Sequence, residues 1–305
     1  MTSSKGLKLA LLLSIAVSVA ACGSTQSVSQ AAVANDELRD TDMDLVFATE
    51  FPVTNKADAM TRAAEAWSSG DINRVLFFYV RALQFDSEDA DLLAAIGKLH
   101  HSQNRPEMAA RAFSMALRVD PDHAASLEGR GLIFLAYDRD DVAETDLQRV
   151  VKIAPTAWRA HNALGMLADR RGDHRIATMH YDAALAIVPE SAMVLNNRGY
   201  SSFLAGNYSN ATADLHNAAG RHGYERAWMN LGVLYSRQGK YILAIDMYLN
   251  VLSQAETYNK VAEAAMANSD YETAQQLLEQ AIYESPTFFP AAEENLAQLH
   301  LHMQL

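Results

Sequence analysis

The pattern of apolar and polar positions divides the chain into three parts. A predominantly apolar run extends from Leu9 to Ala21. The stretch from Gly23 to Glu50 is rich in Ser, Gln and Ala and then in acidic residues, and it shows little apolar periodicity. Beyond it, small and apolar residues recur at a constant spacing through most of the remaining chain. We therefore expect an apolar leader, a flexible spacer and one long folded body.

Three residue types recur at a fixed interval in the body. They stand at Gly97, Gly131, Gly165 and Gly199, at Ala109, Ala143, Ala177 and Ala211, and at Pro121, Pro155 and Pro189. A period of 34 with these types at constant offsets resembles the tetratricopeptide repeat (TPR), whose unit is a helix-turn-helix pair. The resemblance implies an all-α, right-handed superhelical TPR solenoid.

The clearest copy of the repeat reads WRAHNALGMLADRRGDHRIATMHYDAALAIVPES. Gly165 and Ala177 are predicted to be small because the two helices approach closely there, and Tyr181 to be large because it fills the gap toward the next repeat. Pro189 lacks an N–H group and ends the second helix. In the turn at 171–173, glycine can take a positive φ and aspartate can cap the next helix. The same structural role as that of Gly165 is predicted for Gly97, Gly131, Gly199 and Gly232.

The same offsets place seven repeats in the body, followed by a terminal capping helix. The predicted bounds are 56–89, 90–123, 124–157, 158–191, 192–224, 225–254 and 255–288, with the cap at 289–305. The sixth repeat is short, since Ala274 follows Ala244 at a smaller interval than the one that separates the earlier repeat alanines. We expect the connection near 253–256 to be tightened as a result.

The leader has the features of a secretory signal peptide. Lys5 and Lys8 precede an apolar run of about 13 residues, which is shorter than the roughly 20 that a membrane-spanning helix needs. The run ends in the tetrapeptide VAAC, which resembles the lipobox of bacterial lipoproteins. The resemblance implies that residues 1–21 are removed and that Cys22, the single cysteine, carries acyl chains such as palmitate. An ordinary signal peptide with an unrelated cysteine is the alternative.

Gly23, directly after the cysteine, bears on membrane sorting. In lipoproteins of diderm bacteria an aspartate at this position commonly retains the protein in the inner membrane, so glycine implies the periplasmic face of the outer membrane. The inner membrane is the alternative. Buried acyl chains contribute about 0.8 kcal/mol per CH₂ and anchor durably. We expect 22–50 to be a lipidated flexible tether of roughly 30 Å end-to-end distance, and 51–305 to be the solenoid.

The charge of the chain excludes two classes of partner. The sequence has 25 basic and 37 acidic side chains. Loss of Lys5 and Lys8 with the leader leaves 23 basic against 37 acidic side chains, a formal charge of −14. Nucleic acids and anionic lipid surfaces are poor partners for such a chain.

No sequence motif points to catalysis. The chain has no HExxH, P-loop, GxGxxG or GxSxG motif. The pairs His100-His101 and His300/His302 do not have a spacing that brings ligands together with a carboxylate or thiolate. Seven repeats and a cap also occupy the whole body. We therefore expect no enzyme activity, no cofactor and no metal site.

Function in such solenoids lies on the concave surface, which the first helix of each pair lines. The family's groove-facing offsets predict an apolar central groove with interspersed amide and guanidinium groups. Its residues are Leu132, Leu135, Asn162, Met166, Asn196, Tyr200, Phe203, Arg226, Met229 and Val233. Such a groove suits an amphipathic helix of a protein partner. Leu132, Leu135 and Met166 could instead only seal neighbouring helices, whereas Tyr200 and Phe203 are the better candidates for anchors.

The lipobox and the body together resemble the TadD-like lipoproteins of tight-adherence (Flp) pilus assembly. Stretches such as VLNNRGYSSFLAGNY and RAWMNLGVLY carry this likeness. It implies an outer-membrane protein-binding scaffold, or pilotin, whose partner is the secretin or another pilus-assembly component. Two alternatives remain: a PilF-like pilotin of type IV pili, and an NlpI-like periplasmic adaptor of cell-wall hydrolases.

Overall fold

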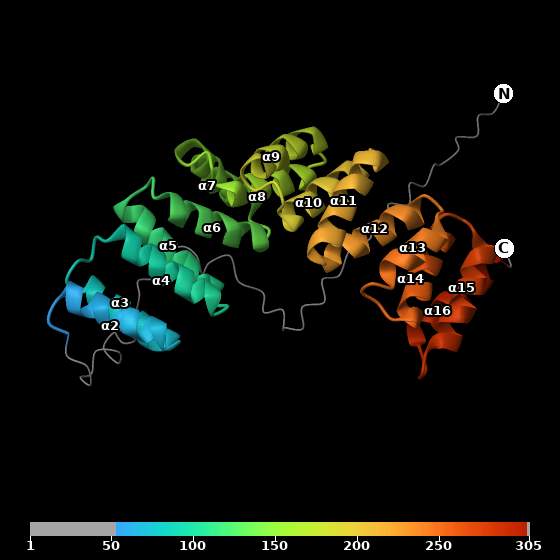
Figure 1. The fold of residues 1–305 in the computed structure, drawn as a ribbon, viewed down its shortest axis with the longest axis horizontal. Coiled ribbons are helices and arrows are strands. Elements are labelled where there is room, and N and C mark those ends of the chain that lie inside the picture. The colour runs from blue at the N-terminus through green and yellow to red at the C-terminus, as the bar shows by residue number, and fades with distance from the viewer. Residues whose placement is uncertain (1–52, 304–305) are drawn as a thin grey trace, which may run out of the picture. The chain divides into compact units, whose positions relative to one another are not determined.

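The computed structural model describes residues 53–303 (Figure 1). The predicted leader, the lipidation site Cys22, Gly23 and the tether 22–50 lie outside the described residues. Within 53–303 the chain forms fifteen α-helices and no strand. The predicted all-α class is confirmed.

The helices follow one another in pairs. The first helices of the pairs are α2 (Lys56–Ser68), α4 (Ala90–Ser102), α6 (Ala124–Ala136), α8 (Trp158–Arg170), α10 (Ala192–Leu204), α12 (Glu225–Arg237) and α14 (Gln254–Ala267). The second helices are α3 (Ile72–Leu83), α5 (Pro106–Val119), α7 (Asp140–Ile153), α9 (His174–Ile187), α11 (Tyr208–His222), α13 (Tyr241–Tyr248) and α15 (Tyr271–Glu284). A final helix, α16 (Pro290–Met303), follows the seventh pair.

Contacts between successive pairs build the solenoid. Each second helix packs against the first helix of its own pair and against the first helix of the next. From α4 to α16, each first helix also contacts the first helix that follows it. Clusters of buried apolar side chains cross these boundaries, and one of them runs from Ala168 in α8 to Leu234 in α12. We call the surface formed by the first helices the inner face.

A large side chain of the second helix lies over each repeat glycine. A Cβ atom added to Gly165 would lie 2.6 Å from Cε1 of Tyr181, and one added to Gly232 would lie 2.4 Å from Cε1 of Tyr248. The glycine is therefore needed to admit this side chain. The Tyr181 ring fills space within its own repeat as well as toward the next, where it shares a core cluster with Val194.

The turn between the two helices of a pair needs a residue at positive φ. Gly172 has φ +79°, and Asn104 and Asp138 take the same conformation with φ values of 57° and 56°. Asp173 occupies the N-cap position of α9, but its side chain makes no capping hydrogen bond. The predicted capping role of Asp173 is thus not realised, whereas Asp71 does cap α3 by accepting from the N–H of Arg74 at 3.0 Å.

The sixth pair is shortened in its second helix. Helix α13 has 8 residues, whereas the other second helices have 12 to 15. Helix α14 then begins with a capping box in which Ser253 and Glu256 bond each other's backbone N–H groups. The sixth repeat is therefore shortened within helix α13, and not in the connection near 253–256 where the shortening was expected.

Candidate functional site

Four asparagines on three consecutive first helices form a hydrogen-bonded row on the inner face, which we call the amide row. They are Asn162 in α8, Asn196 and Asn197 in α10, and Asn230 in α12. Asn230 Nδ2 donates to Asn196 Oδ1 at 2.8 Å, and Asn196 Nδ2 donates to Asn197 Oδ1 at 3.3 Å. Asn197 Nδ2 donates in turn to Asn162 Oδ1 at 3.0 Å. The row crosses two repeat boundaries.

The row ends at a buried donor with weak acceptors. Asn162 is only 5% exposed. Its Nδ2 atom has as acceptors, among the described residues, the sulfur atoms of Met166 at 3.7 Å and Met193 at 4.0 Å. Thioether sulfur is a weak acceptor, and a buried amide donor without a good acceptor costs free energy.

A second polar row lies on the inner face at α14 and α16. Asn295 Nδ2 donates to Asn259 Oδ1 at 3.0 Å, and Asn259 Nδ2 donates to Glu263 Oε1 at 3.1 Å. Asn259 is buried, and Asn295 is half-buried. Side-chain amides therefore lie on the inner face both before and after the short helix α13.

The structure divides the ten predicted groove residues into groups. Leu135 is 5% exposed and belongs to a core cluster, so it is not available to a partner, and its assignment to the groove is corrected. Asn162 and Asn196 are buried in the amide row. Five others are half-buried and pack against core clusters: Leu132, Met166, Phe203, Met229 and Val233. Tyr200 is half-buried and Arg226 is exposed.

The predicted aromatic anchors are part of a row of three rings. The ring centroids of Tyr200 and Phe203 lie 5.8 Å apart, and those of Phe203 and Tyr208 lie 6.1 Å apart. Because Phe203 also packs on the core, its truncation is expected to affect stability as well as binding. Tyr208 was not among the predicted site residues, and its position at the start of α11 gave no signal of this contact.

Two ion pairs with buried carboxylates join the first and second helices of their pairs. Arg130 in α6 binds both carboxylate oxygens of Asp146 in α7, at 2.7 and 2.8 Å. Arg198 in α10 binds Asp214 in α11 in the same way, at 2.7 Å for each contact. Sequence reasoning missed both pairs. The sequence does contain a pattern that could have predicted them. In alternate repeats an arginine stands directly before the repeat glycine, and an aspartate follows that arginine 16 residues later.

The carboxylate of Asp169 joins three helices. It accepts hydrogen bonds from the hydroxyl of Tyr181 in α9 at 2.9 Å and from the hydroxyl of Ser201 in α10 at 2.6 Å. His174 Nδ1 lies 2.8 Å from the same carboxylate. Burial, with the neighbouring Asp169 charge, raises the pKa of Tyr181, so that its phenol remains a donor. These bonds hold α8 and α10 in the register that the amide row requires.

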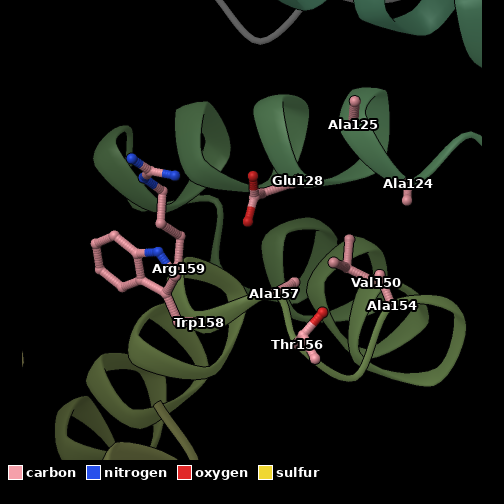
Figure 2. Close-up of a pocket in the computed structure, with 9 residues that line it drawn as sticks. All are labelled: Ala124, Ala125, Glu128, Val150, Ala154, Thr156, Ala157, Trp158 and Arg159. Atoms are coloured by element: carbon pink, nitrogen blue, oxygen red, sulfur yellow. The ribbon is translucent and has the colours of Figure 1, made fainter. Parts of the chain in front are cut away.

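An open pocket of about 240 Å³ lies beside the inner face, between the first half of α6 and the connection from α7 to α8 (Figure 2). Its lining residues are Ala124, Ala125, Glu128, Val150, Ala154, Thr156, Ala157, Trp158 and Arg159. The guanidinium carbon of Arg159 lies 4.6 Å from the ring centroid of Trp158. Glu128 and Arg159 thus bring opposite charges to adjacent first helices, which suits a polar peptide segment better than a small apolar ligand.

Within the described part of the chain, no group of three or more His, Cys, Asp or Glu side chains is placed to hold a metal ion. His100 is buried, and this burial lowers its pKa, as for a histidine packed in a core. None of the helices in 53–303 combines the length and apolar composition that crossing a membrane requires.

Comparison with known proteins places the repeats in one family. Three models, each described as tetratricopeptide repeat, match residues 94–157 and 162–219, residues 227–262, and residues 255–288. Together they cover more than half of the chain. Proteins with these repeats bind protein partners and are generally scaffolds rather than enzymes.

Curated relatives share this repeat at low identity. Anaphase-promoting complex subunit 3 of Schizosaccharomyces pombe is 25% identical over 44% of this chain and 20% of its own length. Tetratricopeptide repeat protein 6 of Homo sapiens is 22% identical over 59% and 35%. Protein FlbA of Caulobacter vibrioides is 24% identical over 48% and 24%. The chain thus spans about a third or less of the length of these relatives.

Solved structures share the fold. A tetratricopeptide repeat protein from Parabacteroides merdae superposes with a TM-score of 0.58 at 15% identity, covering 80% of this chain and 98% of that one. PilW, described as a widely conserved type IV pilus biogenesis factor, gives 0.56 at 18% identity, covering 69% and 98%. At such identities the likeness concerns the fold alone. The paired helices, their shared core clusters and the three family matches agree, and the chain belongs to the tetratricopeptide-repeat family as a superhelical protein-interaction scaffold.

Proposed function

We propose that this chain is a lipid-anchored scaffold, or pilotin, of Flp pilus assembly, which binds the secretin or another assembly component along the inner face. The lipobox ending at Cys22 supports lipid anchoring, and Gly23 supports the periplasmic face of the outer membrane. The tether 22–50, if flexible, would let the solenoid reach a client near that membrane.

The amide row carries the assignment of the binding surface. Side-chain amides both donate and accept, as peptide groups do, so a row of them across α8, α10 and α12 suits the backbone of an extended segment. Asn197 and Asn230 are half-buried and are the members of the row open to a partner, whereas Asn162 and Asn196 are buried beneath them. Tyr200 and the exposed Arg226 flank the row on α10 and α12 and would contact side chains of the partner.

A role in type IV pili is the second candidate. The likeness to PilW supports it, since the shared fold covers 98% of that chain. The surface used would be the same, and only the client would differ.

Crosslinking in the native host, followed by identification of the captured proteins, tests the client. Recovery of a Flp secretin or its assembly partners is expected, and recovery of type IV pilus components would favour the second candidate. Recovery of peptidoglycan hydrolases instead would favour the periplasmic-adaptor alternative and contradict both pilus assignments.

Variants of the amide row test the surface. Asn197→Ala and Asn230→Ala should each weaken binding of the captured client by about 1 kcal/mol or more. Asn217→Ala is the matched control, because Asn217 is exposed on the second helix α11. If the control weakens binding equally, or if binding falls only as far as the folded fraction falls, the inner face is not the site.

A further inference from the structure

The C-terminal end of the solenoid has an apolar surface where a cap is normally polar. Terminal repeats keep stacked proteins soluble through a polar outer face. Here Tyr283 near the end of α15 is 82% exposed, Phe288 in the following connection is 76% exposed, and Leu301 in α16 is 65% exposed. Among the described residues, only Ile242 matches these large apolar side chains in exposure.

Leu301 lies on α16, Phe288 lies in the connection that leads into it, and Tyr283 lies near the end of α15. Ala292 and Leu299 are fully buried against the preceding helices. Most of the remaining surface of the helix is exposed, and on it Ala291, Glu294, Gln298 and Leu301 continue from Phe288 at a spacing of three to four residues, outside the buried stripe. We call the surface formed by Phe288, Ala291, Glu294, Gln298 and Leu301 the terminal face.

Helix α16 is built as the first helix of an eighth pair. It contacts both α15 and α14, as the earlier first helices contact their two predecessors (Figure 1). Asn295 bonds Asn259 of α14 on the inner face, as Asn230 bonds Asn196 between α12 and α10. Within the described residues, no second helix covers the exposed side of α16. The terminal face therefore has the geometry that accepts one further helix.

The negative charge of the C-terminal end indicates which kind of helix would bind there. From Val261 to Leu305 the sequence has seven Asp or Glu residues and no Lys or Arg. Glu279, Glu293 and Glu294 are exposed on α15 and α16. A second copy of this end would bring acid against acid, and the acidic segment 36–50 of this chain would meet the same repulsion. A helix that carries lysine or arginine beside apolar residues matches both features.

We infer that the terminal face docks a basic amphipathic helix of a partner protein, which stacks on α16 in the place of a second helix. The apolar side of that helix covers Phe288 and Leu301, and its basic side chains lie near Glu293 and Glu294. This surface is separate from the amide row. The two can therefore be tested independently.

A synthetic peptide with leucines at helical spacing and lysines elsewhere provides the probe, with binding to the purified chain followed by fluorescence anisotropy. Two control peptides have the same composition in scrambled order, or glutamate in place of lysine. The patterned basic peptide should bind at least tenfold more tightly than either control, and added salt should weaken it. Equal binding of the scrambled peptide would overturn the inference.

The double variant Phe288→Ser/Leu301→Ser should reduce this affinity at least tenfold while leaving the helical signal unchanged, because both side chains are exposed. Ile242→Ser on α13 is the matched control, since Ile242 is 77% exposed elsewhere on the surface. Unaltered affinity in the double variant, or an equal loss in the control, would refute docking at the terminal face. So would self-association that the double variant abolishes in sedimentation experiments, because a second copy would then be the occupant.

Discussion

Arg198 in α10 and Asp214 in α11 form a two-point ion pair, in which Nε and Nη2 each lie 2.7 Å from a carboxylate oxygen. The remaining Nη1 reaches Asp182 of the preceding repeat, also at 2.7 Å. The side chain of Asp214 is 10% exposed. The hydrogen bonds that Arg198 donates to Asp214, and then the one it donates to Asp182, raise the pKa of its guanidinium, so Arg198 remains charged. One arginine thus links three helices.

The ion pairs alternate with aromatic residues along the stack. Repeats with arginine before the glycine have leucine over that glycine, as with Arg130 and Leu147. Repeats with an aliphatic residue before the glycine have an aromatic ring there, as with Leu164 and Tyr181. The same space between helices is filled either by a ring or by a leucine with a neighbouring ion pair.

Removal of one partner of the Arg198–Asp214 pair should be costly. Arg198→Leu leaves a buried carboxylate without its cation, and we expect a loss of about 3–5 kcal/mol in the free energy of unfolding. Arg198→Leu/Asp214→Met, which reproduces Leu231 and Met247 at the same positions of the sixth pair, should recover much of this loss. Urea denaturation of both variants provides the measurement. A double variant no more stable than the single one would contradict this account.

Gly165→Ala should destabilise the protein because its Cβ would lie 2.6 Å from the Tyr181 ring. Overpacking of this kind typically costs about 1–3 kcal/mol. Gly220→Ala in α11 is the matched control, since no atom lies within 4 Å of its added Cβ. The control should be neutral or stabilising by up to about 1 kcal/mol, because alanine is the better helix former. Thermal melts followed by circular dichroism measure the stability of both variants. Equal effects of Gly165→Ala and Gly220→Ala would show that the ring contact is unimportant.

Alkaline pH should weaken the fold through Tyr248. Burial is the main cause that raises its pKa to about 12, above the usual value of about 10. Between these values the unfolded chain loses the phenol proton and the folded chain keeps it. The free energy of unfolding should therefore fall as pH rises, by up to about 1.4 kcal/mol per pH unit from this group.

Tyr248→Phe isolates that contribution, because it keeps the ring over Gly232 and removes the ionisable hydroxyl. The raised pKa of Tyr181 acts equally in both proteins. Unfolding free energies at several pH values from 9 to 11 should show a steeper decline in the parent chain than in the variant. Parallel declines would refute a role for Tyr248.

Cys22→Ser should release the protein from the outer membrane, because the acyl chains would have no site of attachment. Cell fractionation, with mass spectrometry of the mature N-terminus, measures this change. Gly23→Asp should instead move the protein to the inner membrane while leaving it acylated. If the serine form stayed in the outer-membrane fraction with full function, the lipobox interpretation would be wrong.

The regular period of the repeat predicted the class of fold and the order of its helix pairs, because helix-turn-helix packing places small and large residues at constant offsets. It could not assign roles to individual side chains. Leu135 fits the groove-facing offset yet is buried, and Asp173 fits the capping position yet makes no capping bond. Offsets describe an average repeat, whereas burial depends on the neighbours that a particular repeat meets.

Local residue types and their spacing were enough to specify that this chain is a stack of helix pairs with glycine under a larger side chain. The amide row, the ion pairs and the terminal face arise only in the folded stack. Asn230 and Asn196 are 34 residues apart in sequence, and their 2.8 Å contact depends on how α12 is rotated and shifted against α10. That geometry is the sum of many packing contacts between repeats, so no single segment of the sequence contains it.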